Sequence, residues 1–205
     1  MSISIAVFIS GRGSNLNAII QAVNDKQLDA EIKLVVSNDP DAMGLTIAKQ
    51  HEIETFALSH KGMKRREHED KIIAHLKNYK IDYVVLAGYM RILSKRFLSN
   101  FKHEDGFFKV INIHPSLLPA FPGTDGYKDA FEYGAKVSGV TVHLVDEEVD
   151  HGPILAQVPF PIFPEDTLDS VKARGLSVEH ALYPSILQQI AQEGINIKPR
   201  KVVAQ

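Results

Sequence analysis

Two hydrophobic periodicities, that of a buried strand and that of a helix, alternate along this chain from near its first residue. Residues 5–9 form an unbroken apolar run, as expected of a strand buried on both faces. A glycine-rich segment, residues 11–15, ends this run. Apolar residues then recur at helical spacing, at Leu16, Ile19, Ile20 and Val23. A strand followed by a helix in this way is typical of a parallel sheet.

The same alternation repeats through the first half of the chain. Residues 32–36, 54–58 and 83–87 are runs that predict further strands. Helical spacing predicts a short helix over residues 45–48 and an amphipathic helix over residues 66–79. We therefore expect an α/β fold, a Rossmann-like domain with a mainly parallel central sheet and helices on both faces.

The second half has a different pattern, which predicts a mixed and more irregular part of the fold. Residues 109–113 predict a strand that runs into a proline-rich loop. Residues 138–145 and 153–158 predict two more strands, with an acidic segment between them. A long helical pattern then extends over residues 167–192.

Thr167 is the expected N-cap of this last helix, whereas Gly175 and Pro184 should weaken or kink it. We find no internal repeat, low-complexity tract or linker. We therefore expect residues 1–205 to form a single domain, with a nucleotide-type half over about residues 1–100 and a catalytic half over about residues 101–205.

The composition excludes several classes of protein. The chain has 205 residues and no cysteine, which excludes disulfides, thiolate zinc sites and a cysteine nucleophile. Its net charge of -2 provides no broad basic surface for nucleic acid. No cationic leader precedes the first strand, and the longest apolar stretch, residues 83–90, is far shorter than the ~18 residues of a membrane span. We expect a cytoplasmic protein that binds neither nucleic acid nor a membrane.

The glycine-rich segment between the first strand and the first helix is a candidate anion site. Glycines permit a tight turn there, and the helix that follows offers unpaired N–H groups to a phosphate. Alternatively, Ser14 or Asn15 could simply cap the helix. Leu16 stands where a dinucleotide fingerprint requires a third glycine, so NAD is disfavoured, although Asp39 lies where an NAD ribose ligand could be. We favour phosphate recognition.

Asn112 and His114 form the second candidate site, at the end of a predicted strand. Residues two apart on a strand project to the same side, and ligands of open α/β sheets bind beyond the strand ends. An amide donor beside an imidazole suits a developing oxyanion, and the imidazole can also move protons. The alternative is a histidine that is merely packed between prolines.

The third candidate is the acidic segment at residues 146–150. Runs of acidic residues are usually solvated loops. Asp150 differs because it immediately precedes His-Gly-Pro at residues 151–153, where the chain turns into a strand. A carboxylate there could orient a neighbouring imidazole or favour its charged form. The spacing alone leaves open whether Asp150 meets His114.

Five segments together resemble the folate-dependent formyltransferases, in the order in which that family has them. They are residues 9–16 (Ile-Ser-Gly-Arg-Gly-Ser-Asn-Leu), 86–93 (Leu-Ala-Gly-Tyr-Met-Arg-Ile-Leu), 112–119 (Asn-Ile-His-Pro-Ser-Leu-Leu-Pro), 139–143 (Gly-Val-Thr-Val-His) and 149–154 (Val-Asp-His-Gly-Pro-Ile). The glycine segment alone is a weak signal. The string Asn-x-His-Pro-Ser-Leu-Leu-Pro followed by Asp-x-Gly-Pro is specific.

The resemblance implies 10-formyltetrahydrofolate as the co-substrate, the amine of glycinamide ribonucleotide as the acceptor, and no metal. It implies that the amine attacks the formyl carbon directly and gives a tetrahedral oxyanion. Asn112 and protonated His114 would donate hydrogen bonds to that oxyanion, and Asp150 would keep the imidazole charged.

The resemblance also assigns binding residues. Gly13, Ser14 and Asn15 would hold the acceptor's phosphate and Glu179 its ribose, although Glu179 could equally be an ordinary exposed helix residue. The implied folate site comprises Arg65, Met90, Arg91, Ile92, Leu93, Asn112, Asp146, Glu147, Glu148, Val149 and Asp150. Arg65 lies among several cations at residues 61–66, a stretch that would also suit a solvated face.

One departure from the family pattern concerns the segment after Phe-Pro-Gly. Many members carry a histidine there, where this chain has Thr124 and Asp125. Either that histidine is dispensable or Asp125 replaces part of its role. The surrounding residues 120–126 could form a mobile flap.

Other functions remain open at this point. Methionyl-tRNA formyltransferases and formyltetrahydrofolate deformylases share the core strings but carry an additional domain for which this chain has no room, which favours the glycinamide acceptor. A deformylase-like hydrolase, a silent nucleotide-binding module, and a metal-dependent hydrolase using His114, His143, Asp150 and His151 are the alternatives, although no His-Glu-x-x-His motif is present. We expect a monomer or a homodimer.

Overall fold

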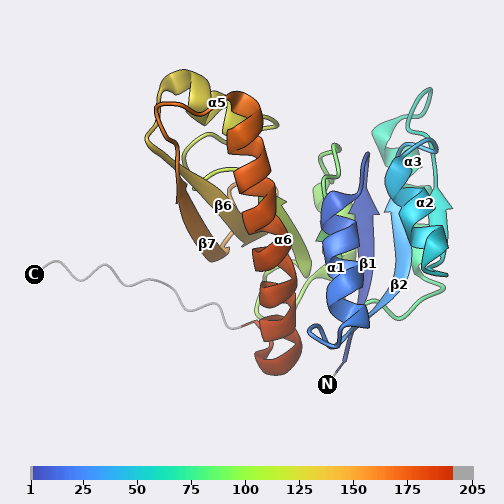
Figure 1. Cartoon of the computed structure of the whole chain (residues 1–205). Helices are drawn as coiled ribbons and strands as arrows, with labels where there is room; N and C mark the ends of the chain where they lie inside the picture. The colour runs from blue at the N-terminus through green and yellow to red at the C-terminus, as the bar shows by residue number, and fades with distance from the viewer. Residues whose placement is uncertain (1, 196–205) are drawn as a thin grey trace, which may run out of the picture.

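The computed structural model describes residues 2–195, and a seven-stranded sheet runs through it (Figure 1). The strand order is β3-β2-β1-β4-β5-β6-β7. The parallel strands are β1 (Ile3–Ile9), β2 (Ala30–Ser37), β3 (Thr55–Ala57), β4 (Tyr83–Leu86) and β5 (Val110–His114). β6 (Val137–Leu144) and β7 (Ile154–Pro161) are antiparallel to their neighbours, so the expected α/β class with a mixed C-terminal part is confirmed.

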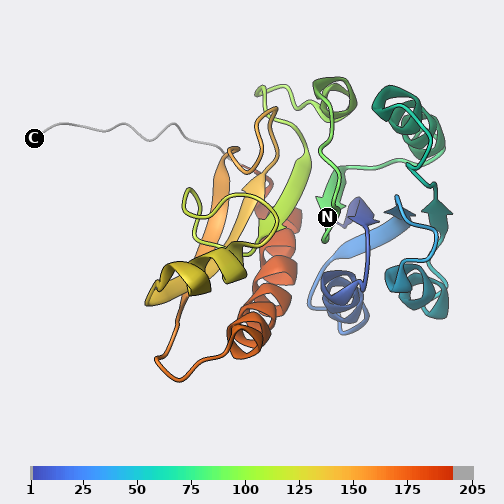
Figure 2. The ribbon, with the colours of Figure 1, turned by 90° about the horizontal axis from the view of Figure 1, so that it is seen from above.

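Helices cover both faces of this sheet, as Figure 2 shows from above. α1 (Ser14–Asn24), α2 (Met43–Gln50), α5 (Gly126–Tyr133) and α6 (Leu168–Glu193) share one hydrophobic core with the sheet. α3 (Arg65–Leu76) and α4 (Lys95–Leu98) pack on the other face, and a short 3-10 helix, Ser99–Phe101, follows α4. No helix among residues 2–195 is long and apolar enough to cross a membrane.

The continuous apolar run of β1 is explained by burial on both sides. Ile5, Val7 and Ile9 face the core beneath α1 and α6, whereas Ala6 and Phe8 face the core beneath α3 and α4. All five side chains are fully buried. A central parallel strand flanked by helices requires this pattern, since neither of its faces reaches water.

The long helix α6 begins where the sequence predicts and contains both expected helix breakers. Thr167 is its N-cap, as predicted, and its side chain accepts a hydrogen bond from the Ser170 N–H. The helix continues through Gly175 and Pro184, and the weakening or kink expected at these residues stays a prediction. Gly175 has a packing reason, because a methyl group there would overlap the ring of Tyr127 on α5.

The sequence analysis did not predict α5. Tyr127, Ala130 and Phe131 recur at helical spacing, but the helix has only eight residues and begins at Gly126, the last residue of the segment for which we expected a flap. Packing stabilises the helix. Tyr127 and Ala130 are buried, and Gly126 allows close approach, since a Cβ there would lie 2.6 Å from the Pro115 carbonyl oxygen. α5 is thereby held against the end of β5.

The strand order indicates where a ligand would bind. β1 pairs with β2 on one side and β4 on the other, so successive connections leave it in opposite directions. Ligands of open α/β sheets bind outside the carboxyl ends of strands at such a switch point. The carboxyl ends of β1, β4 and β5 meet here.

Candidate active site

A cavity of about 820 Å³ lies over the carboxyl ends of β1, β4 and β5. Its walls are residues 10–15, 86–93, 112–115, 123–125, 127–128 and 145–150, together with one face of α6 and His143. Every residue that the sequence analysis assigned to the acceptor, the folate or the chemistry lines this cavity, apart from Arg65. Its volume suits small-molecule ligands, whose pockets typically measure ~300–1,000 Å³.

The glycine loop forms the N-terminal end of α1. Gly13 is the N-cap, with a left-handed φ of 76°, and a Cβ there would lie 2.6 Å from the Cα of Gly44. Only glycine fits both constraints. The alternative reading in which Ser14 or Asn15 caps the helix is wrong, because both lie inside α1 and no side chain caps it. The first-turn N–H groups and the helix dipole are therefore available to an anion.

Glu179 lies deep in the same cavity and is only 6% exposed, so it is not an ordinary surface residue of α6. One carboxylate oxygen, Oε2, accepts a hydrogen bond from the Asn15 amide at 2.6 Å. The other, Oε1, accepts one from the Tyr127 hydroxyl, also at 2.6 Å. These two bonds tie α6 to α1 and α5 beside the glycine loop.

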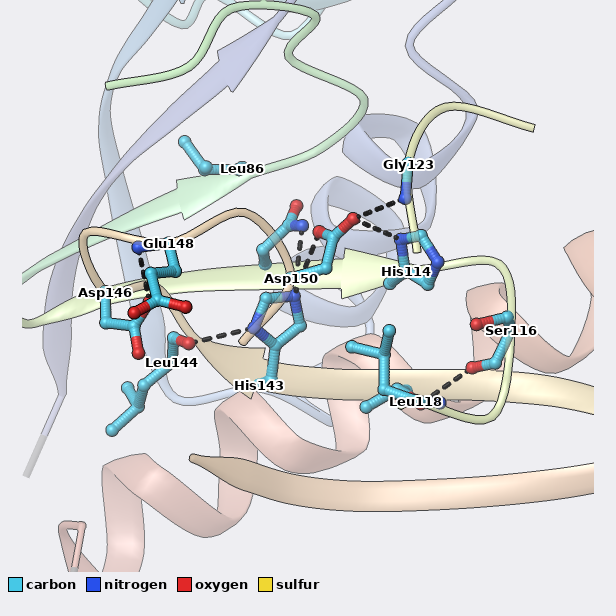
Figure 3. A network of polar contacts seen from close by, with 12 residues as sticks. Leu86, His114, Ser116, Leu118, Gly123, His143, Leu144, Asp146, Glu148 and Asp150 are labelled. Carbon is cyan, nitrogen blue, oxygen red and sulfur yellow. Dashed lines mark hydrogen bonds and ion pairs between the residues drawn. The ribbon is translucent and has the colours of Figure 1, made fainter. Parts of the chain in front are cut away.

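The side chains of His114 and Asp150 also meet in the wall of this cavity, although they are 36 positions apart in the chain. His114 Nδ1 lies 3.4 Å from Asp150 Oδ2, and both side chains are at least nine-tenths buried. The same carboxylate oxygen accepts a hydrogen bond from the Gly123 N–H at 2.8 Å (Figure 3). His114 Nε2 faces the Phe121 carbonyl oxygen at 2.8 Å. Both ring nitrogens of His114 thus face acceptors, an arrangement that suits the imidazolium.

His143 joins this group, although the sequence analysis gave it no role in formyl transfer and named it only within the family segment 139–143 and in the alternative metal-dependent hydrolase. It lies opposite Asn112 in the antiparallel pairing of β5 with β6. Its Nδ1 faces the Leu144 carbonyl at 2.8 Å, and its Nε2 lies 3.2 Å from the Asn112 amide nitrogen. A carbonyl accepts only from N–H, so Nδ1 carries the proton and Nε2 accepts from Asn112.

The electrostatic environment of His143 agrees with a neutral ring. Burial lowers the pKa of His143, outweighing smaller raising effects of the Leu144 carbonyl and the Asp150 carboxylate. Neutral His143 therefore fixes the orientation of Asn112, since it accepts one of the two amide hydrogens. The second hydrogen is left for a ligand in the cavity. Only the register of β6 against β5 reveals this pair.

The loop that carries Asp150 is held by its own polar contacts. Asp146 accepts hydrogen bonds from the Glu148 N–H at 2.9 Å and from His151 at 2.8 Å, and the bond to Asp146 raises the pKa of His151. Glu147 forms an ion pair with Lys95 of α4 at 2.8 Å. Asp150 itself has a left-handed φ of 55°, a conformation that aspartate tolerates better than most residues.

Arg65 is the one assigned residue outside the cavity lining. It begins α3, and its Nε lies 3.3 Å from the Oε1 of buried Glu69. Glu69 in turn accepts a hydrogen bond from the Ser94 N–H at 2.8 Å, next to the cavity segment at residues 90–93. A folate contact by Arg65 stays a prediction.

Three other residues that the sequence analysis named also have clear positions. Asp125 is the exposed N-cap residue of α5 and lines the cavity. That Asp125 replaces part of the role of the family's histidine stays a prediction. Asp39 does not line the cavity. His151 is exposed and turned toward Asp146. Within residues 2–195, no group of three or more His, Cys, Asp or Glu side chains is arranged to hold a metal ion.

Comparisons with known proteins agree with this geometry. Residues 3–187 match the family model described as formyl transferase. Phosphoribosylglycinamide formyltransferase of Haemophilus influenzae is 41% identical over 195 residues, which are 95% of this chain and 90% of that protein. The enzyme of the same name from Escherichia coli is 42% identical over 189 residues, covering 92% and 87% of the two chains.

The fold comparison gives the same result. The crystal structure of phosphoribosylglycinamide formyltransferase from Bacillus halodurans superposes with a TM-score of 0.88 at 40% identity, covering 95% of this chain and 98% of that one. The matched residues include the glycine loop, the His114 segment and the Asp150 loop. The chain belongs to the formyl transferase family.

Proposed function

We propose that this enzyme transfers the formyl group of 10-formyltetrahydrofolate to the amine of glycinamide ribonucleotide, a step of purine biosynthesis. The names of the relatives support this acceptor, and the cavity supports it independently. The cavity is lined by the uncapped N-terminus of α1, which can bind an anion, and by the His114–Asp150 pair. A phosphorylated amine can bind with its phosphate at the N-terminus of α1 and its nitrogen near His114.

Phosphate binding is proposed at Gly13, Ser14 and Asn15. The backbone amides of this turn supply hydrogen bonds and the dipole of α1 supplies partial positive charge. Lys172 adds a cation, since it lines the same cavity from the first turns of α6. Glu179 is proposed to accept from the ribose hydroxyls, which would lie between the phosphate and the reacting amine.

The formyl donor is proposed to bind along residues 90–93 and 146–150, with Asn112 at the reacting end. Apolar side chains of this part of the cavity, such as Leu86, Ile92 and Val145, suit a flat heterocycle. Polar atoms of the two loops are available to its ring nitrogens and carbonyl. Residues from both halves of the chain therefore build each ligand's site.

The proposed reaction is a direct transfer. The lone pair of the amine forms a C–N bond to the formyl carbon, and the carbonyl oxygen becomes an oxyanion. The Asn112 amide hydrogen that His143 leaves free, and the His114 imidazolium, are proposed to stabilise that charge. Such a donor contributes about 2.7–4 kcal/mol in well-studied hydrolases.

Collapse of the intermediate breaks the bond between the formyl carbon and the folate nitrogen. The amine loses one proton, and the leaving nitrogen gains one. Asp150 is proposed to hold the charge on His114 throughout, because its carboxylate lies 3.4 Å from Nδ1 and is fixed by the Gly123 N–H. Proton transfer runs between the two nitrogens on the side of the cavity that faces Asp150.

The observation that carries the proposal is the convergence of Asn112, His114 and Asp150 in a cavity that the uncapped N-terminus of α1 also lines. The test is to incubate the purified protein with 10-formyltetrahydrofolate, with and without glycinamide ribonucleotide, and to quantify formylated acceptor and formate. We expect one formylated acceptor for each formyl donor consumed, and no consumption of the donor when the acceptor is left out. Formate release at the same rate without acceptor would instead identify a deformylase-like hydrolase.

A further inference from the structure

Tyr127 is a buried side chain of the cavity wall to which the proposed reaction gives no role. It is 6% exposed and belongs to α5, the helix that the sequence analysis did not predict. Its hydroxyl donates to Oε1 of Glu179 at 2.6 Å. That distance is short for a hydrogen bond between side chains, as expected when the acceptor is a carboxylate.

The fold holds the tyrosine ring in one orientation. Gly175 lies one turn before Glu179 on α6, and any side chain at Gly175 would overlap the ring. On another side, the ring of Phe160 packs against Tyr127 edge to face, with centroids 5.8 Å apart. A helix interior usually disfavours glycine by about 1 kcal/mol, so the close contact with Tyr127 is the compensating gain at Gly175.

Two uncharged donors hold the Glu179 carboxylate, namely the Tyr127 hydroxyl and the Asn15 amide. Among residues 2–195, no lysine, arginine or histidine forms an ion pair with it. Burial, and then the negative charge of Glu179, raises the pKa of Tyr127, so the phenol keeps its proton and remains a donor. Loss of either donor would leave part of a buried carboxylate unpaired.

The geometry of the two bonds determines what the carboxylate can still bind. Each oxygen of a carboxylate has two acceptor positions, and one on each is occupied. The two remaining positions, one per oxygen, suit two neighbouring hydroxyl groups of a sugar. Asn15 belongs to the first turn of α1, so the bond to Asn15 also fixes the carboxylate relative to the phosphate loop.

We propose that Tyr127 is a positioning residue for the acceptor: it orients Glu179 so that both carboxylate oxygens accept hydrogen bonds from the acceptor's ribose hydroxyls. The inference rests on the proposed function and adds a residue to its acceptor site. Tyr127 acts through Glu179 and touches neither the formyl donor nor the His114–Asp150 pair.

The test is a comparison of steady-state kinetics for wild type and Tyr127→Phe, with glycinamide ribonucleotide and 10-formyltetrahydrofolate varied in turn. We expect KM for the acceptor to rise about 10- to 100-fold, the range for a lost hydrogen bond to a charged group. KM for the formyl donor and kcat should change less than about threefold. The matched control is Tyr133→Phe, which removes the hydroxyl of an 82% exposed tyrosine on the same helix and should leave all three values unchanged.

A double-mutant cycle separates positioning from general loss of packing. If Tyr127 acts through Glu179, the acceptor KM of the double variant Tyr127→Phe, Glu179→Gln should be less than about threefold above that of Glu179→Gln alone. Should Tyr127→Phe fail to fold, Glu179→Asp tests the same point, since it keeps the charge but withdraws the carboxylate from the tyrosine. It should give the same selective rise in acceptor KM.

Two results would overturn the inference. One is an acceptor KM within about twofold of wild type in Tyr127→Phe or in Glu179→Asp. The other is an equal rise in KM for both substrates, which would indicate a general disturbance of the cavity. Failure of the proposed function looks different, because wild-type protein would then form no formylated acceptor at all.

Discussion

Replacing Asp150 by asparagine removes one negative charge from the His114 wall of the cavity while keeping the shape of the side chain. The asparagine can still accept the hydrogen bond from the Gly123 N–H through its carbonyl oxygen. The loop at residues 146–150 also keeps its other contacts, the His151–Asp146 bond and the Lys95–Glu147 pair. The substitution therefore tests the charge of Asp150 rather than the loop conformation.

The expected magnitude follows from the distance between the two groups. Opposite unit charges 3.4 Å apart attract each other by about 5 kcal/mol at an effective dielectric constant of about 20. Burial of both groups offsets part of this gain, and breaking a buried ion pair typically costs about 3–5 kcal/mol. If the pair is intact when the oxyanion forms, kcat should fall by about 100- to 5,000-fold.

The assay is the initial rate of formylated acceptor at saturating substrates, combined with calorimetric titration of the acceptor alone. Asp150 belongs to the His114 wall and not to the phosphate loop, so the acceptor's dissociation constant should stay within about threefold of wild type. Asp129→Asn is the matched control. It neutralises an exposed carboxylate of α5 outside the cavity lining and should leave kcat unchanged.

Two outcomes would refute this reasoning. A kcat less than about tenfold below wild type would mean that the charge of Asp150 contributes little to the barrier. A parallel loss of acceptor affinity would mean that Asp150 acts on the shape of the whole cavity.

Three further predictions concern other parts of the molecule. Ser14→Ala should raise the acceptor KM, because it removes the hydroxyl that can donate to the phosphate beside the backbone amides, and should change thermal stability little, because Ser14 forms no capping bond; an unchanged KM would mean that the Ser14 hydroxyl does not bind the phosphate. Gly175→Ala should destabilise the fold by about 1–3 kcal/mol in urea denaturation, because the methyl group overlaps the Tyr127 ring; greater stability, as helix propensity alone predicts, would contradict this packing. Burial lowers the pKa of His143. The stability that neutral His143 contributes is therefore complete above its pKa in the unfolded chain, ~6.5, and is lost as pH falls through its pKa in the folded protein. The free energy of unfolding should therefore decrease less between pH ~7.5 and ~5.5 in His143→Gln than in wild type, and equal decreases would refute a neutral buried ring.

Much of the fold was predictable because its signals are local. The buried strands β1, β2 and β4 lie within two residues of the predicted bounds, since burial on both faces demands unbroken apolar runs. Thr167 was recognisable as an N-cap from its position before the helical pattern. α5 was not predicted, because its helical pattern covers only eight residues, and contacts of Tyr127 and Gly126 with distant elements stabilise it.

The candidate site likewise has parts that the sequence predicts and parts that it does not. The sequence alone predicts that Asn112 and His114 project to the same side, because residues two apart on a strand do so. It also predicts the glycine turn at the N-terminus of α1. Its resemblance to a known family supplied the remaining assignments, which composition and spacing could not.

Which distant groups meet becomes visible in the folded chain alone. The pairing of β5 with β6 places His143 opposite Asn112, and the loop after β6 brings Asp150 to His114. The packing of α5 against α6 brings Tyr127 to Glu179. Strand order, register and helix packing follow from the burial of the whole chain, so no local stretch of sequence specifies these contacts.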